Sequence, residues 1–320
     1  MRAVVIKGCC KADELTVTDI PIPKVCPGWV LIKVHAAGLN HSEAILRMYE
    51  ADEDYIPTPI VPGIECAGEV ADASDSNLQT GDCVVALMGG IGRSFNGSYE
   101  EYVLVPRSHV FKVNTSLSWT ALAAIPETYF TAYGSLTMGL GLHKGDHLLV
   151  RGATSTVGQA AIQLAKALGA TVTATSRRED SFARLSRIGA DECIVDDGKL
   201  CQRAWSHRPN KLLELVGPKT LRDSLLTVSR PGYVCDTGIL GNVFTIEHFE
   251  PIKYLPNGVF LSSFYSNHPT ESVIHDLFQL ISEHGITPLY SRVMKLKDIV
   301  EAHTLLERGD AGGKLILDLD

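Results

Sequence analysis

Residues 151–159 have the composition of a turn that could hold a phosphate group. They read RGATSTVGQ and lie between the apolar run HLLV and the helix-like stretch AAIQLAKALGA. A pyrophosphate binds at a helix N-terminus because free backbone N–H groups and the helix dipole both face the anion. The dinucleotide-binding pattern G-x-G-x-x-G keeps only Gly158 here, since Ala153 and Ser155 stand at its first two glycine positions. Taken alone, this loop is equally compatible with a dinucleotide site and with an ordinary turn that binds nothing.

The turn after the next strand separates these two interpretations. In such folds the ribose is recognised about 20 residues after the loop, and a carboxylate there selects a free 2′-hydroxyl. This chain instead reads TVTATSRRED, in which Ser176 is followed by Arg177 and Arg178. A hydroxyl beside guanidinium groups suits a 2′-phosphate, which arginine can bind through two parallel hydrogen bonds. We therefore predict an NADP(H) site, the alternative being two arginines on a solvated helix start.

The length and charge of the chain limit the classes of function. A chain of 320 residues is long enough for two domains. Its formal net charge of −8 supplies no excess of cations for nucleic acid or for an anionic membrane. No apolar run approaches the ~20 residues that span a bilayer, and the first residues lack the apolar stretch of a signal peptide. We expect a cytoplasmic protein with a small-molecule substrate and without nucleic-acid or membrane partners.

Two kinds of segment divide the chain. Short β-branched segments broken by Gly, Pro and Asp fill the first part, as in a rolled sheet or barrel. From residue 118 an apolar stretch with helical spacing is followed by alternating strands and helices, which is typical of a doubly wound parallel sheet. We expect a nucleotide-binding domain over residues 119–265, inserted into a β-rich domain made of residues 1–118 and 266–320, with a cleft between them.

Several segments in a fixed order make the chain resemble a known superfamily. They include VLIKVHAAGLNHSE, PGIECAGEV, GDCVVAL, GSYEEYVLVP, IPETYFTAYGSL, the phosphate-binding loop with its helix, GADECIVD and GGKLILDL. Together they resemble the medium-chain dehydrogenase/reductase superfamily, and within it the zinc-independent branch similar to quinone oxidoreductases. The resemblance implies an α/β fold in which a Rossmann domain with a doubly wound parallel sheet is inserted into a β-rich, GroES-like catalytic domain. It also implies chemistry on a nicotinamide cofactor.

The same resemblance bears on metal binding. Zinc members of the superfamily hold a catalytic metal with a cysteine, a histidine and a second cysteine, at positions that match Asn40, Ile64 and Glu127 here. Isoleucine cannot ligate, and one amide with one carboxylate makes a poor zinc site. The four-cysteine zinc lobe of relatives is replaced by LMGGIGRSFNG, whose glycines favour a mobile lid. We expect no metal.

Without a metal to stabilise an alkoxide, alcohol oxidation loses its main electrostatic support. Hydride transfer from NADPH to a quinone or an α,β-unsaturated carbonyl suits the site better, because the charge then develops on an oxygen that needs only hydrogen-bond donors. The candidate donors are Asn40 and Tyr49, the alternatives being a turn-capping asparagine and a tyrosine in a surface loop. Ile45 stands where some quinone reductases carry a tyrosine, which leaves the quinone open. An enoyl-thioester reductase and a catalytically silent NADPH-binding sensor are the other interpretations.

The resemblance implies further contacts to the cofactor. Thr131 matches a threonine beside the nicotinamide ribose, and Lys314 matches a basic residue at the pyrophosphate. Other candidates follow predicted strands, at the sheet edge where ligands bind in such folds. The full predicted set is Thr131, Ala153, Thr154, Ser155, Thr156, Val157, Gly158, Ser176, Arg177, Arg178, Val216, Gly217, Gly238, Ile239, Ser263, Phe264 and Lys314. Relatives commonly pair two such sheets at an edge, so we expect a homodimer with GVFLSSF as the pairing strand.

Overall fold

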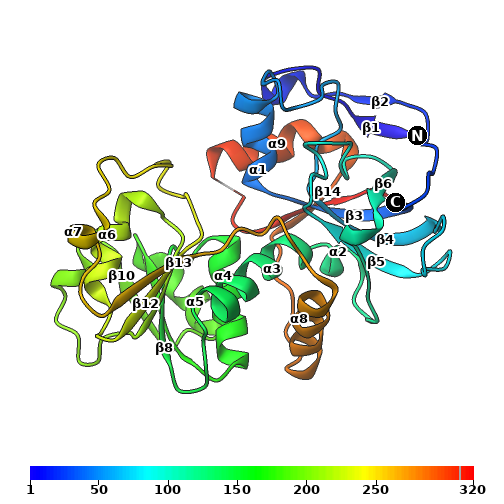
Figure 1. Cartoon of the computed structure of the whole chain (residues 1–320). Helices are drawn as coiled ribbons and strands as arrows, with labels where there is room; N and C mark the ends of the chain where they lie inside the picture. Colours follow the sequence, from blue (N-terminus) through cyan, green and yellow to red (C-terminus); the bar gives the residue numbers. More distant parts are fainter. Residues whose placement is uncertain (310) are drawn as a thin grey trace. The chain divides into compact units, whose positions relative to one another are not determined.

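A computed structural model describes residues 1–309 and 311–320 of the chain, which form two compact units (Figure 1). The first unit comprises Met1–Glu127, Asn267–Gln279 and Thr287–Asp320. The second comprises Thr128–Ser266 and Leu280–Ile286. The sequence predicts domain boundaries at residues 118/119 and 265/266. That these boundaries separate two domains stays a prediction.

The second unit is built on a six-stranded parallel sheet. Its strands lie in the order β10-β9-β8-β11-β12-β13, and every neighbouring pair is parallel. They are β8 (His147–Arg151), β9 (Thr171–Ser176), β10 (Glu192–Val195), β11 (Lys211–Glu214), β12 (Gly232–Asp236) and β13 (Val259–Ser263). The order reverses between β8 and β11, which is the switch point where doubly wound folds bind ligands. The predicted Rossmann-type sheet is confirmed.

Helices flank this sheet and follow its strands. They are α4 (Thr156–Ala167), η5 (Glu179–Ser181), α5 (Phe182–Arg187), η6 (Leu200–Gln202), α6 (Pro218–Thr227) and α7 (Pro251–Tyr254). The buried face of α4 includes Ala160, Ala161, Leu164 and Ala165. Residues 160 and 164, and residues 161 and 165, are four apart, as on one face of an amphipathic helix. The strands beneath are apolar on both faces, as Leu148 to Val150 are fully buried.

The apolar stretch that starts near residue 118 is divided. It forms α2 (Trp119–Leu122), α3 (Pro126–Gly134) and the π-helical turn η4 (Ser135–Gly139). Pro126 explains the break, because proline has no backbone N–H and is tolerated only in the first turn of a helix. The single helical stretch read from the spacing is therefore corrected to two short helices and a turn.

The first unit is β-rich, as predicted. Its main sheet has the order β14-β15-β3-β4-β5-β7, with β6 paired to β3, and β1 and β2 form a separate pair. The strands are β1 (Arg2–Val4), β2 (Val17–Asp19), β3 (Trp29–Leu39), β4 (Glu65–Asp72), β5 (Cys83–Leu87), β6 (Tyr102–Pro106), β7 (Val110–Lys112), β14 (Arg292–Lys295) and β15 (Leu315–Asp318). The helical segments are η1 (Ala12–Glu14), α1 (His41–Ile45), η2 (Leu46–Glu50), η3 (Arg107–His109), η7 (Leu296–Asp298) and α9 (Ile299–Arg308), while α8 (Glu271–Glu283) contributes to both units. The core of this unit packs residues 30, 32 and 34 of β3 against β4 and β5.

The glycine-rich segment 88–97 is anchored within the first unit. Ile91 is buried in the core, and Arg93 pairs with Glu50 and donates to the Ser42 hydroxyl over 2.9 Å. Asn96 accepts a hydrogen bond of 3.1 Å from the backbone of Val61. The lid expected from the glycines stays a prediction, and each of these anchors would have to break for the segment to open.

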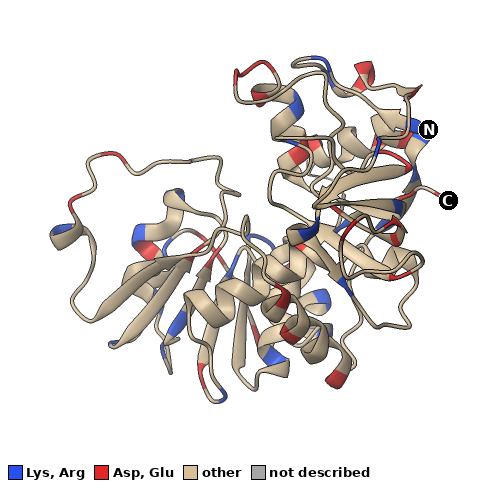
Figure 2. Ribbon diagram, turned by 45° about the vertical axis from the view of Figure 1, so that its right-hand side comes forward, with Lys and Arg blue, Asp and Glu red and all other residues tan. Residues whose placement is uncertain are grey.

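Charges of both signs are spread over both units (Figure 2). Among the helices that the structure describes, none combines the length and the apolar character needed to cross a membrane.

Candidate cofactor and active site

The 151–159 loop is a strand-to-helix turn. β8 ends at Arg151 and α4 begins at Thr156, with Ser155 as its N-cap. The Ser155 hydroxyl accepts from the Gly158 N–H over 3.1 Å and donates to the Gly152 carbonyl over 2.8 Å. Serine at this glycine position therefore caps the helix. The Ser155 N–H donates to the Gly152 carbonyl over 3.1 Å. The N–H groups of Thr156 and Val157 lack intrahelical acceptors, which makes them suitable for an anion.

Gly158, the remaining glycine of the pattern, is required by packing. A Cβ atom at this position would lie 2.6 Å from the Gly152 carbonyl oxygen and 2.7 Å from the Ala153 Cα. Ala153 itself is fully buried under the helix. The loop can thus replace two glycines by Ala153 and Ser155 but has no room for a side chain at residue 158.

The ribose-recognition turn lies beside this loop. The Gly152 N–H donates to the Thr175 hydroxyl over 3.3 Å, which joins the ends of β8 and β9. Ser176 ends β9, and its Oγ accepts from the Arg178 N–H over 3.2 Å and from the Ser181 hydroxyl over 2.7 Å. The Ser181 hydroxyl also lies 3.0 Å from the Arg178 carbonyl oxygen. Because Ser181 has a single hydrogen, the Ser176 hydroxyl either keeps its own hydrogen for a ligand or donates it to Ser181.

The two arginines of this turn differ in their surroundings. Both side chains are exposed. The Arg178 Nε lies 3.2 Å from the Asp180 carboxylate. Within residues 1–309 and 311–320, Arg177 makes no ion pair, so its guanidinium group can meet a phosphate without leaving a carboxylate.

Two further turns meet at the same edge of the sheet. The buried Glu214 carboxylate accepts from the N–H groups of Val216 (2.7 Å) and Gly217 (3.1 Å), which fixes the turn between β11 and α6. Burial raises the pKa of Glu214. Gly217 has a φ of +89°, and a Cβ there would collide with the Gly238 carbonyl after β12. The predicted contacts at 216–217 and 238–239 are therefore adjacent.

Arg151 is a part of the site that the sequence reasoning missed. Its guanidinium is fully buried and donates twice to Asp196, over 2.8 Å from both Nε and Nη2. Its Nη1 donates to Asp223 (2.8 Å) and to Ser224 (2.9 Å) of α6. The group thus joins the ends of β8 and β10 to α6 directly beneath the loop. The sequence signal that could have revealed Arg151 is its charge directly after the apolar run HLLV.

Residues predicted near the nicotinamide also lie in the second unit. The Thr131 hydroxyl is buried and has no hydrogen bond among the described residues, so it can serve a bound group. Ser263 ends β13, and the ring of Phe264 packs edge-on against Phe130 with centroids 5.5 Å apart. Together with the capped α4 terminus and the close-packed glycine turns, this orphaned hydroxyl fits a dinucleotide.

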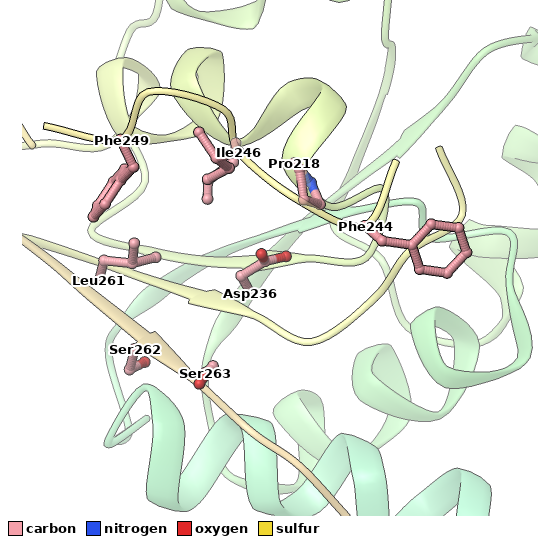
Figure 3. A pocket seen from close by; sticks show the side chains of 9 residues that line it. Pro218, Asp236, Phe244, Ile246, Phe249, Leu261, Ser262 and Ser263 are labelled. Atoms are coloured by element: carbon pink, nitrogen blue, oxygen red, sulfur yellow. The ribbon is translucent and has the colours of Figure 1, made fainter. Parts of the chain in front are cut away.

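A cavity of ≈ 440 Å³ opens at the carboxyl ends of β12 and β13 (Figure 3). Its lining is mainly apolar and consists of Pro218, Leu221, Asp236, Phe244, Ile246, Phe249, Leu261, Ser262 and Ser263. One carboxylate oxygen of Asp236 is buried without a hydrogen bond from the described part of the chain. Burial, assisted by the nearby Glu214 carboxylate, raises the pKa of Asp236 to about 7. The cavity was not predicted, because residues 218 to 263 meet there only after folding.

Asn40, the first predicted hydrogen-bond donor, caps α1 in the first unit. Its backbone N–H donates to the buried Glu43 over 2.8 Å, and its amide nitrogen donates to Glu65 over 2.8 Å. Its amide oxygen accepts from the Lys314 ammonium over 2.5 Å. Asn40 is therefore the N-cap residue of α1 through its backbone, while its side-chain amide is engaged by Glu65 and Lys314 and makes no capping hydrogen bond. A role toward substrate stays a prediction.

The other two predictions for the first unit concern Tyr49 and Lys314. Tyr49 is 68% exposed on η2, as expected for a surface tyrosine. Lys314 is only 2% exposed, and its ammonium is bound to Asn40 and Glu65. The pyrophosphate contact predicted for Lys314 stays a prediction, but its charge already has partners within this unit.

The positions that match zinc ligands do not fit a metal. The Asn40 oxygen is occupied by an ammonium group, and Ile64 presents a buried hydrocarbon side chain. Over residues 1–309 and 311–320, no cluster of three or more His, Cys, Asp or Glu residues has the geometry of a metal site. Asn40 and Ile64 do not fit zinc because zinc prefers thiolate and imidazole ligands, and neither side chain provides one.

Comparison with known proteins agrees with this architecture. The family described as alcohol dehydrogenase GroES-like domain matches residues 26–115, and that described as zinc-binding dehydrogenase matches residues 156–283. The human quinone oxidoreductase is 28% identical over 93% of this chain and 91% of its own length. A quinone oxidoreductase-like protein 2 homolog from Nematostella vectensis is 32% identical over 65% of this chain, which spans 58% of that protein.

A solved structure points to the same superfamily. The crystal structure of an NAD-dependent alcohol dehydrogenase superposes with a TM-score of 0.88 at 28% identity, covering 100% of both chains. The two family matches together cover more than half of the chain. The chain therefore belongs to the medium-chain dehydrogenase/reductase superfamily, in its quinone-oxidoreductase-like branch, whose members are oxidoreductases that use a nicotinamide cofactor.

Proposed function

We propose that the protein is an NADPH-dependent oxidoreductase that acts without zinc and transfers a hydride to a quinone or an α,β-unsaturated carbonyl. The observation that carries the cofactor assignment is the turn at Ser176, where a hydroxyl at the strand end lies beside Arg177, whose exposed side chain makes no ion pair with the described residues. No carboxylate ends β9, so a 2′-phosphate meets no like charge at the strand end.

The remaining residues of the second unit then have separate roles. The N-terminus of α4 holds the pyrophosphate, and Glu214 fixes the turn that carries Val216 and Gly217. The Thr131 hydroxyl supplies a hydrogen bond toward the nicotinamide end. Bound NADPH supplies the hydride, while the chain orients the cofactor and excludes water from it.

Zinc independence follows from the donor set of the first unit. An amide whose oxygen is occupied and an isoleucine provide neither thiolate nor imidazole. A substrate whose charge develops on a conjugated oxygen needs hydrogen-bond donors rather than a Lewis acid. Quinones and enones meet this condition, and simple alcohols do not.

Binding of the two nicotinamide cofactors tests the assignment. Titration of the intrinsic fluorescence with NADPH and with NADH should give a dissociation constant for NADPH that is lower by about tenfold or more. Equal affinity would overturn the reading of Ser176 and Arg177. It would favour the NADH alternative, as in the relative named an NAD-dependent alcohol dehydrogenase.

We also propose a cytoplasmic homodimer in which β13 of one copy pairs with β13 of the other. β13 is the outer strand of its sheet. Phe260 on this strand is 54% exposed and stacks on Tyr233 with ring centroids 4.9 Å apart, which leaves an apolar surface beside an open edge. Light scattering of the purified chain should give twice the mass of one copy, and a monomer at every concentration would refute the pairing.

A further inference from the structure

A buried ammonium group lies among the polar side chains of the first unit. The Lys314 Nζ donates to the Glu65 carboxylate and to the Asn40 amide oxygen, each over 2.5 Å. The side chains of Lys314 and Glu65 are 1% and 0% exposed. Because an isolated buried charge is very unfavourable, the two ions depend on one another.

The three residues come together because their strands are neighbours. Lys314 directly precedes β15, Asn40 directly follows β3, and Glu65 begins β4, and these strands are adjacent in the sheet. They pack on the bare backbone of Gly38, where a Cβ atom would lie 2.7 Å from the Lys314 Cε and would also collide with the Glu65 carboxylate. The ion pair is thus fitted tightly into the sheet.

The hydrogen bonds around this pair are complete on the carboxylate side. One Glu65 oxygen accepts from Asn40 and Lys314, and the other accepts from the Glu127 N–H over 2.7 Å. Glu43 faces the same group and accepts from the N–H groups of Asn40 (2.8 Å) and Ile64 (3.2 Å). Burial raises the pKa of Glu43 to about 7, although the Lys314 charge acts to lower it. The Lys314 ammonium is the basic group that donates to both Glu65 and Asn40 in this cluster.

Asn40 and Ile64 are the positions that match metal ligands in zinc relatives, and the residues present do not fit a metal. We propose that Lys314 is the resident cation of this site, which fixes the Asn40 amide and the Glu65 carboxylate without a metal. Lys314 is then a positioning residue that acts through Asn40. The proposal rests on the zinc-independent function proposed above.

A double-mutant cycle tests the ion pair. Lys314→Met and Glu65→Gln should each lower the Tm of the full chain, by about 5–10 °C, because each leaves one buried partner unpaired. The double variant should lose clearly less than the sum of the two, and strictly additive losses would overturn the proposal. Lys314→Arg keeps the cation and should stay more stable than Lys314→Met. The coupling in the double-mutant cycle decides the proposal, because the tight packing against Gly38 can destabilise the larger arginine for steric reasons alone.

A metal probe separates the cation from simple packing. Lys314→Ala leaves the oxygens of Glu65 and Asn40 beside a vacated position, and oxygen donors of this kind suit Mn²⁺. Mn²⁺ at about 1 mM should raise the Tm of this variant but not that of the wild type or of Lys314→Ala/Glu65→Gln. If Mn²⁺ does not raise the Tm of Lys314→Ala, the proposal of a cation site is contradicted.

The same variants distinguish this role from a pyrophosphate contact. If Lys314 is internal, NADPH should bind Lys314→Met within about twofold of the wild type, whereas loss of a phosphate contact would weaken it about tenfold or more. A tenfold loss with an unchanged Tm would overturn the proposal. The thermal and Mn²⁺ measurements need neither cofactor nor turnover. They can therefore contradict the role of Lys314 while the proposed function stands, and the proposed function can fail while the role of Lys314 stands.

Discussion

Replacing Arg177 with alanine should weaken the binding of NADPH and leave that of NADH almost unchanged. Arg177 follows Ser176 at the end of β9, its side chain is exposed, and it forms no ion pair with the residues that the structure describes. Its guanidinium can therefore bind a 2′-phosphate without first giving up a carboxylate. NADH lacks that phosphate and gains nothing from the residue.

The size of the effect follows from the kind of bond that is lost. A hydrogen bond to a charged group contributes about 1–3 kcal/mol, which corresponds to roughly 5- to 150-fold in the dissociation constant of NADPH. Arg178→Ala should cost less, because Arg178 must share its guanidinium with Asp180, 3.2 Å away. That exposed pair is itself worth only about 0–1 kcal/mol, so the two arginines should differ by no more than this. Asp180→Asn should strengthen NADPH slightly by freeing Arg178.

Fluorescence titrations of each variant with both cofactors measure these differences. Arg187→Ala is the matched control, because it removes an exposed arginine from α5, away from the turn. The control should bind both cofactors as the wild type does. The reasoning is refuted if Arg177→Ala weakens NADPH and NADH equally, since the residue would then not distinguish the phosphate.

Two further predictions concern the packing of the loop and the pH dependence of stability. Gly158→Ala should lower the free energy of unfolding by about 1–3 kcal/mol and weaken both cofactors together, because its Cβ would collide with Gly152 and Ala153; urea unfolding and the two titrations check this, and an unchanged stability would contradict the packing argument. Glu100 is fully buried, neither carboxylate oxygen has a hydrogen bond from the described residues, and burial raises its pKa to about 8. Its folded-state pKa lies above the unfolded value, so the folded chain holds the extra proton, and the stability should fall as the pH rises from about 4.5 through 8. Glu100→Gln should flatten the Tm measured across this range, whereas an equal slope in both proteins would show that Glu100 does not titrate there.

Local patterns predicted the second unit well because they act over short stretches. The alternation of strands and helices indicated the parallel sheet, and the 151–159 loop was located at the start of α4. The same reasoning missed contacts between distant residues. Arg151 meets Asp223, and Lys314 meets Glu65, 249 residues away, only because the sheets bring strand ends together.

One error has a simpler physical cause. The helical spacing after residue 118 was extended across Pro126, although proline cannot continue a helix from its interior. The anchors of the glycine-rich segment 88–97, which are the ion pair of Arg93 and the burial of Ile91, were not predicted. Glycine content alone does not reveal such anchors.

Hydride transfer from NADPH without zinc can be tested in a single experiment. The purified chain is treated with a chelator, its zinc content is determined by elemental analysis, and NADPH oxidation is followed with 1,4-benzoquinone and with a simple enone as acceptors. We predict turnover of NADPH by protein that holds only substoichiometric zinc, with no gain when zinc is added. Stoichiometric zinc that resists the chelator, activity that returns only with added zinc, or no oxidation with either acceptor would contradict it.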